Sequence, residues 1–156
     1  MKKRIYLDDV RTPVNDPHTP DLDWIVVRNY SEFLSKVEAI GLDNIEVISL
    51  DHDLGPSAMT EYFEHVSPHY ELDYSRITEK TGYDCAKWLV EHFYQKNPEN
   101  LDMSRIVKKE SKFEFPQVYV HSANPIGSAN IMGYVNNFLM NEGRPQTCVR
   151  VQIKHT

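Results

Sequence analysis

Val47-Ile48-Ser49-Leu50-Asp51-His52-Asp53 is the stretch that decides the fold, because an apolar run ends there in two carboxylates. The segment Ile5-Tyr6-Leu7-Asp8-Asp9 repeats this pattern near the start of the chain. Apolar runs of this length are typical of buried strands, and open α/β sheets hold their sites at the carboxyl ends of their strands. Four carboxylates in one crevice repel each other, so they require a cation, a shared proton or a wide separation.

The rest of the chain alternates between strand-like and helix-like segments. Short β-branched or aromatic runs predict five strands, at 4–7, 24–28, 45–50, 117–121 and 148–153. Helical spacing predicts a helix over 31–40, a second that opens with Thr81 and Asp84 as a capping box, and a third that starts at Pro125 with Asn124 as N-cap. Helices between strands imply right-handed crossovers and a mostly parallel sheet, so the acidic strand ends share one edge.

Two stretches depart from this alternation, and each follows an acidic strand end. In the first, 11–23, Pro13, Pro17 and Pro20 oppose a helix. The second is a long polar and aromatic insertion that we expect to be a loop at about 56–80. Each is either a specificity element beside a site or a tolerated surface insertion, and both interpretations stay open.

The composition fits a single domain of 156 residues, because 40% hydrophobic and 26% charged residues are ordinary for a soluble globular protein. A formal net charge of −6 argues against a wide nucleic-acid footprint, so any such contact is expected to be short. Cys85 and Cys148 lie in apolar segments, and the sequence shows neither a signal peptide nor a transmembrane run. We therefore expect a reducing, cytoplasmic setting without a membrane partner.

Four motifs, taken in order, resemble a known family. They are Leu7-Asp8-Asp9-Val10-Arg11-Thr12-Pro13, Leu50-Asp51-His52-Asp53-Leu54-Gly55, Thr81-Gly82-Tyr83-Asp84 and His121-Ser122-Ala123-Asn124-Pro125. The set resembles the receiver domains of response regulators, and more narrowly the cyclic-phosphate processing receiver domains, which are thought to act on cyclic phosphate ends of RNA. The resemblance implies a receiver-like (flavodoxin-like) α/β fold of three layers. The strand pattern above predicts a five-stranded, mostly parallel sheet. The chain departs from the usual receiver pattern in a Pro-rich loop in place of the first helix, and it carries an insertion after the third strand.

The resemblance also implies a metal and phosphate site. It suggests that Asp8, Asp9 and Asp51 hold a magnesium ion, and that Ser122 and a later lysine contact the phosphoryl group. The one lysine candidate is Lys154, close to the end of the sequence. A partly hydrated shell of carboxylate oxygens suits Mg²⁺ (or Mn²⁺) better than zinc. The alternative is a turn after the first strand, with aspartates that cap backbone amides.

The spacing of Asp51 and Asp53 indicates a sharper chemistry. One carboxylate can attack phosphorus while the other, two residues later, donates a proton to the leaving oxygen. Haloacid-dehalogenase-type phosphatases use the same spacing after a strand, which is a local analogy. In the alternative, Asp53 only caps the turn toward Leu54 and Gly55.

A second group of candidates lies where the fourth strand meets its helix. His121, Ser122 and Asn124 combine an imidazole, a hydroxyl and helix N-terminal amides, which suits phosphate binding and proton transfer near neutral pH. In the alternative, Asn124 is only a cap and His121 a buried core residue. Arg11 is a candidate phosphate clamp or a solvated loop residue.

Three functional hypotheses follow, from different classes. The favoured one is a metal-dependent phosphohydrolase or phosphodiesterase that acts on cyclic or terminal phosphates, with a short single-stranded RNA end as one substrate. The second is a stand-alone receiver that accepts phosphate on Asp51 as a signalling switch. The third is a non-catalytic module that binds nucleotides or a partner protein. Aromatic residues of the insertion, such as Tyr74, either stack on a base or fix the insertion to its own domain, and the second role is the more common.

Overall fold

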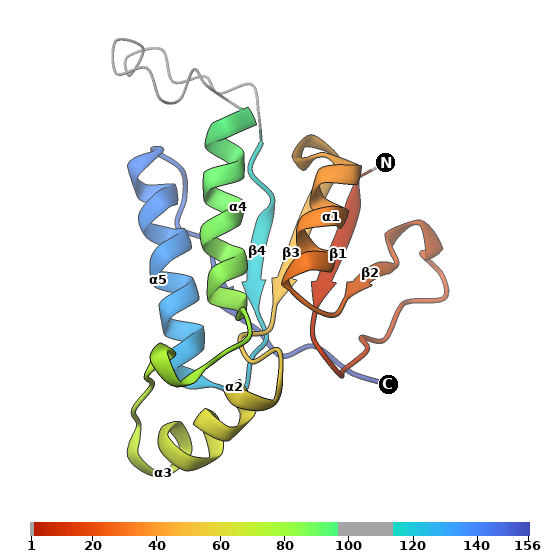
Figure 1. Cartoon of the computed structure of the whole chain (residues 1–156). Helices are drawn as coiled ribbons and strands as arrows, with labels where there is room; N and C mark the ends of the chain where they lie inside the picture. The colour runs from red at the N-terminus through yellow and green to blue at the C-terminus, as the bar shows by residue number, and fades with distance from the viewer. Residues whose placement is uncertain (1, 97–113) are drawn as a thin grey trace.

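The computed structural model describes residues 2–96 and 114–156. Its five strands form one sheet with the order β2-β1-β3-β4-β5, and every neighbouring pair is parallel (Figure 1). The strands are β1 (Lys3–Leu7), β2 (Trp24–Val27), β3 (Ile45–Leu50), β4 (Gln117–Val120) and β5 (Val149–Arg150). The predicted receiver-like sheet is confirmed, and all carboxyl ends lie at one edge.

In the part of the chain that the structure describes, three long helices connect the strands, and their caps follow the sequence signals. They are α1 (Tyr30–Ile40), α4 (Gly82–Lys96) and α5 (Pro125–Asn141). At the start of α4 the backbone N–H of Thr81 donates to Asp84 Oδ2 at 2.9 Å, which confirms the capping box. At the start of α5, Asn124 Oδ1 accepts the N–H groups of Ile126 and Gly127 at 3.1 and 2.9 Å. Among the described residues, no helix is long and apolar enough to span a membrane.

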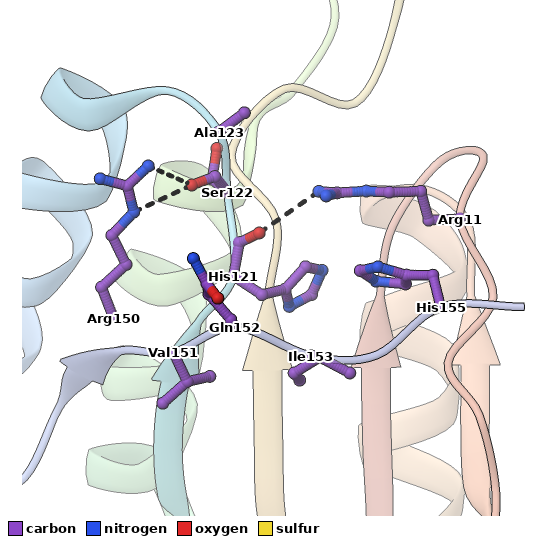
Figure 2. Close-up of a pocket in the computed structure, with 9 residues that line it drawn as sticks. All are labelled: Arg11, His121, Ser122, Ala123, Arg150, Val151, Gln152, Ile153 and His155. Carbon is purple, nitrogen blue, oxygen red and sulfur yellow. Dashed lines mark hydrogen bonds between the residues drawn. The ribbon is translucent and has the colours of Figure 1, made fainter.

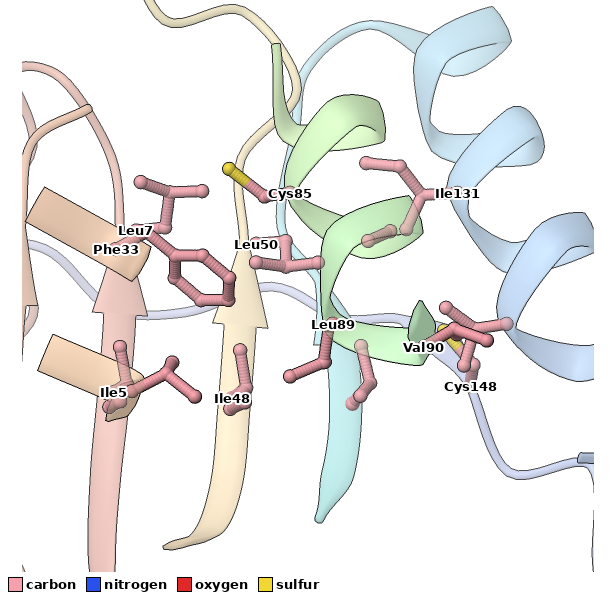
Figure 3. Close-up of a cluster of buried hydrophobic side chains, with 14 of the residues drawn as sticks. Ile5, Leu7, Phe33, Ile48, Leu50, Cys85, Leu89, Val90, Ile131 and Cys148 are labelled. Atoms are coloured by element: carbon pink, nitrogen blue, oxygen red, sulfur yellow. The ribbon is translucent and has the colours of Figure 1, made fainter. Parts of the chain in front are cut away.

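One hydrophobic core fills the space between the sheet and these helices (Figure 3). Its members come from one face of the strands and from the inner faces of α1, α4 and α5, as with Leu7, Leu50, Phe33, Leu89 and Ile131. Helix α1 packs against α4, and α4 packs against α5, so the three form a single layer. In the described residues the long helices therefore cover one face of the sheet, whereas the resemblance implied a fold of three layers.

The Pro-rich stretch between β1 and β2 forms no α-helix, as predicted, because its prolines cannot donate helical hydrogen bonds. The one helical turn in residues 8–23 is the 3₁₀ turn η1 (Pro20–Leu22). Arg28 fixes the start of the loop, because its Nη1 donates to the carbonyl oxygens of Asp8 at 3.1 Å and Arg11 at 2.7 Å. The loop thus holds the residues after β1 in a defined place without a helix.

The fifth strand is shorter than the predicted 148–153. Beyond Val149–Arg150, the N–H of Val151 still donates to the Val120 carbonyl at 2.8 Å, and then the chain turns away from the sheet. Residues 151–156, here called the C-terminal tail, pair antiparallel with the Pro-rich loop, where Pro13 forms a bridge with His155. Lys154 therefore lies beyond the strand, on the exposed part of this tail.

The insertion after β3 is largely helical, which corrects the expectation of a loop at about 56–80. It contains α2 (Pro56–Glu61), the π-helix η3 (Tyr62–Val66), α3 (Ser67–His69) and the 3₁₀ turn η4 (Tyr74–Arg76). Pro56 occupies the first helical position, where a missing N–H costs nothing. Buried Glu61 accepts two hydrogen bonds from Arg76, at 2.7 and 2.9 Å, and so joins both halves of the insertion. The insertion lies at the carboxyl edge of the sheet (Figure 1).

Candidate active site

Three carboxylates converge at the carboxyl edge of the sheet. Asp8 and Asp9 follow β1, Asp51 follows β3, and one oxygen of each lies within 4.8 Å of the others. The parallel pairing of β1 and β3 causes this, because Leu7 faces Leu50 and the N–H of Asp51 donates to the Leu7 carbonyl at 2.9 Å. The sequence-based expectation that these acidic ends meet is therefore confirmed. Their role as metal ligands remains a prediction.

Asp8 is the most firmly held of the three. Its Oδ1 accepts the N–H groups of Val10 and Arg11 at 3.0 and 2.8 Å, and its Oδ2 accepts Arg11 Nε at 2.8 Å. His121 Nε2 lies 3.3 Å from the same Oδ2. Burial raises the pKa of Asp8, but these hydrogen bonds, led by that from His121, outweigh it and lower the pKa to about 2. Asp8 is therefore ionised at neutral pH.

Asp51 differs from Asp8, because fewer favourable interactions offset the effect of burial on its pKa. It is only 6% exposed, and burial together with the charge of Asp8 raises its pKa from 3.8 to about 7. The Arg11 guanidinium, 3.6 Å away, and the His52 N–H, at 2.8 Å, lower the pKa only partly. Burial and Asp8 also raise the pKa of half-buried Asp9. Three close, hard oxygen donors with excess negative charge fit a divalent cation such as Mg²⁺.

His121 lies behind Asp8, with its side chain fully buried. Its Nδ1 lies 2.7 Å from Ser49 Oγ, and its ring stacks on Tyr6 with centroids 4.2 Å apart. Because Asp8 is ionised, Nε2 carries the proton that faces it and Nδ1 accepts the Ser49 hydroxyl. Burial lowers the pKa of His121, so the ring is neutral at pH 7. This placement favours support of Asp8 over the predicted proton transfer to a substrate.

Asp53 ends a chain of buried and part-buried hydrogen bonds that the sequence analysis did not identify. His52 Nδ1 lies 2.6 Å from Asp53 Oδ1, and His52 Nε2 lies 2.9 Å from the Tyr74 hydroxyl. Asn130 Nδ2 donates to that hydroxyl at 3.0 Å. One direction satisfies every atom: Asn130 donates to Tyr74, Tyr74 to His52, and His52 to Asp53. Tyr74 therefore fixes the insertion to the site.

Asn124 and Gly127, at the start of α5, complete this support. Asn124 Nδ2 donates to Asp53 Oδ1 at 3.2 Å, while its Oδ1 caps the helix. Both polar atoms of this buried side chain are thus used inside the protein, so the predicted phosphate contact would require breaking them. Gly127 makes room for the His52 ring, because an added Cβ would overlap it.

Two arginines flank the end of β4 (Figure 2). Arg11 Nη2 donates to the His121 carbonyl at 3.3 Å, and Arg150 donates to the Ser122 carbonyl from Nε at 3.1 Å and from Nη2 at 2.8 Å. Ser122 Oγ accepts the Asn124 N–H at 3.1 Å. The sequence analysis missed Arg150, although it is the one basic residue in the predicted strand 148–153.

The sheet order, the acidic residues after β1 and β3, and the serine after β4 define a receiver-like α/β domain. The family model of the cyclic-phosphate processing receiver domain matches residues 3–137, and the chain belongs to this family. No curated protein and no solved structure matches the chain.

Proposed function

We propose that the protein is a metal-dependent phosphohydrolase or phosphodiesterase that acts on a cyclic or terminal phosphate, with RNA ends as one substrate class. The convergence of Asp8, Asp9 and Asp51 within 4.8 Å carries the proposal. Membership of the cyclic-phosphate processing receiver family supports a phosphate ester as the substrate.

The acidic cluster would hold the metal. Asp9 and Asp51 would supply oxygens, and Asp8, whose oxygens accept four hydrogen bonds, would contribute directly or through water. A Mg²⁺ or Mn²⁺ ion bound there would neutralise the cluster and polarise a phosphoryl oxygen. His121 keeps the Asp8 carboxylate in place, as partners behind metal ligands do.

Asp51 and Asp53 divide the remaining chemistry. Asp51 acts as the nucleophile toward phosphorus or as a ligand that positions the attacking water. Asp53 Oδ1 is occupied by His52 and Asn124, which leaves Oδ2 to exchange protons. Asp53 gives its proton to the leaving ester oxygen and regains one from the water that is consumed. Ser122 Oγ and Arg11 bind the phosphoryl oxygens.

The test is a screen of nucleoside cyclic phosphates and phosphate-ended oligonucleotides with Mg²⁺, with products resolved by chromatography. We expect turnover by the wild type, loss of turnover in EDTA, and at least a hundredfold loss in Asp51→Asn. Asp43→Asn, an exposed aspartate on η2 (Leu42–Asn44), is the matched control and should retain activity. Equal product release by the wild type and Asp51→Asn would exclude the proposed role of Asp51.

The second candidate, a stand-alone receiver, is supported by the family match and by the place of Asp51 at the end of β3. Incubation with acetyl phosphate separates the two. A stable aspartyl-phosphate on Asp51 without turnover supports the switch, whereas the hydrolase predicts continuous release of product. Metal-dependent ligand binding with neither result would indicate the non-catalytic binding module.

A further inference from the structure

A cavity of about 610 Å³ opens beside the acidic cluster, and the chemistry proposed above places substrate only at its lining residues Arg11 and Ser122 (Figure 2). Its walls are the end of β4, Arg150 of β5 and four residues of the C-terminal tail, Val151, Gln152, Ile153 and His155. Arg11 and Arg150 bring two permanent positive charges; Arg11 is paired with Asp8 and Asp51 outside the cavity, and none of the lining residues is acidic. In a chain of net charge −6, this cavity is a local exception that attracts anions.

Both guanidinium groups are fixed in advance of any ligand. Arg11 and Arg150 donate to the consecutive carbonyl oxygens of His121 and Ser122. Within residues 2–96 and 114–156, the Nη1 atom of each arginine has no hydrogen-bond partner. Each side chain thus keeps donors for a ligand while the backbone limits its motion, which lowers the entropy lost on binding.

The tail wall is also fixed in place. Val14 N–H donates to the Lys154 carbonyl at 2.9 Å, and Thr156 N–H donates to the Thr12 carbonyl at 3.0 Å. The His155 ring hydrogen-bonds the Tyr6 hydroxyl. These contacts tie the tail to the same loop that carries Arg11, so the cavity has two anchored walls.

Arg11 belongs to both places, because its Nη2 lies 3.6 Å from Asp51 Oδ2 and its side chain also lines the cavity. An anion in the cavity is therefore a close neighbour of a phosphate at the acidic cluster. The volume lies within the roughly 300–1,000 Å³ of ordinary ligand pockets. It has room for a nucleotide unit that carries a phosphate.

We propose that this cavity binds a second phosphate of the substrate, next to the one that reacts. The inference rests on the proposed function and narrows its substrate class to nucleotides or oligonucleotide ends with two phosphates. Arg150 is the specificity-determining residue, because its Nε and Nη2 are held by the Ser122 carbonyl while its Nη1 stays available to donate to phosphate oxygens.

A binding experiment without turnover tests the cavity. Calorimetry would compare adenosine 3′-monophosphate with adenosine 3′,5′-bisphosphate, both in Mg²⁺, on wild type, Arg150→Gln and Arg150→Lys. We expect the bisphosphate to bind wild type at least tenfold more tightly than the monophosphate. Arg150→Gln should lose that advantage with unchanged monophosphate affinity, and Arg150→Lys should keep part of it. Lys36→Gln, which removes an exposed charge on α1, is the control and should behave as wild type.

The outcomes separate this inference from the proposed function. A bisphosphate advantage that survives in Arg150→Gln, or that is missing in the wild type, overturns the cavity proposal. Turnover that is equally efficient for substrates with one and two phosphates also overturns it, while the hydrolase stands. An advantage that depends on Arg150, without turnover of any ester, supports the cavity and overturns the hydrolase.

Discussion

Two histidine–aspartate pairs support the candidate site, and they differ in what lies behind them. In the first, His121 backs Asp8 and rests on Ser49 of β3 and Tyr6 of β1. In the second, His52 backs Asp53 and is fixed from behind by the insertion and by α5. The first pair is therefore built into the sheet, while the second depends on segments that fold around the sheet edge.

The difference assigns the pairs to different tasks. Hydrogen bonds hold Asp8 as a permanent carboxylate, with a pKa of about 2, which suits a metal ligand. Asp53 keeps one oxygen outside its hydrogen bonds, which suits proton exchange. The second pair also links the insertion to the site, because the Tyr74 hydroxyl of the insertion hydrogen-bonds His52.

The largest expected effect comes from the aspartates themselves. Asp53→Asn should lower kcat by about 10²–10⁴-fold, the usual contribution of a general acid or base, and leave Mg²⁺ affinity nearly unchanged. Asp8→Asn should do the reverse and weaken Mg²⁺ binding first. Steady-state kinetics and Mg²⁺ calorimetry on both variants decide the matter, and equal loss of Mg²⁺ binding in both would show that the pairs share one task.

Asp51 lies between the pairs without a histidine side chain as partner in the described residues, and its titration should show this. Its pKa is raised in the folded state to about 7, so the folded protein binds the proton more tightly than the unfolded chain. The stabilising contribution is complete below about pH 4 and is lost as the pH rises to about 7. Between pH 5 and 8 in EDTA, wild type should lose about 2–3 kcal/mol relative to Asp51→Asn. Urea unfolding at both pH values measures this, and parallel curves would contradict it.

A smaller effect tests how tightly the His52 ring is packed behind Asp53. Gly127→Ala should cost about 1–3 kcal/mol, because the new methyl group overlaps the His52 ring and must displace it. Gly133→Ala on the same helix is the matched control, since an added Cβ there meets no atom within 4 Å. That control should gain about 0.5–1 kcal/mol from helix propensity. Thermal unfolding of both variants checks the contrast, and a gain in Gly127→Ala would mean that His52 is not tightly held.

A substitution of His121 tests the first pair, in which His121 supports Asp8. His121→Gln should lower Mg²⁺ affinity by about 10–100-fold, because residues behind a metal ligand commonly have this effect, while kcat at saturating Mg²⁺ stays closer to wild type. His92→Gln replaces another buried histidine, in α4, and should leave Mg²⁺ binding unchanged. A fall in kcat that saturating Mg²⁺ does not restore would instead favour the proton-transfer role predicted from sequence.

The two pairs also show which features of the fold and the site can be predicted from the sequence. Apolar runs and capping residues are local signals, so the strands, the caps of α4 and α5 and the meeting of Asp8 with Asp51 were predictable. The support behind Asp53 was not, because Tyr74 lies 22 residues from His52 and its direction depends on how the insertion folds. The end of β5 could not be predicted either, since apolar and polar residues alternate as far as Ile153 although the strand stops pairing with β4 near Val151.

The smallest predicted effect is the sharpest test of the link between the insertion and the site. Tyr74→Phe removes only the hydroxyl, which donates to His52 and accepts from Asn130, so the free energy of unfolding should fall by about 1–2 kcal/mol through the loss of two hydrogen bonds. His52 then loses one of the two partners that hold its ring, and kcat should fall several-fold while Mg²⁺ affinity is unchanged. Tyr70→Phe, on the same insertion with a 69% exposed side chain, is the control and should match wild type. If both variants lowered kcat equally, the insertion would act on the site through its fold alone, and the Asp53 pair would need no contact from it.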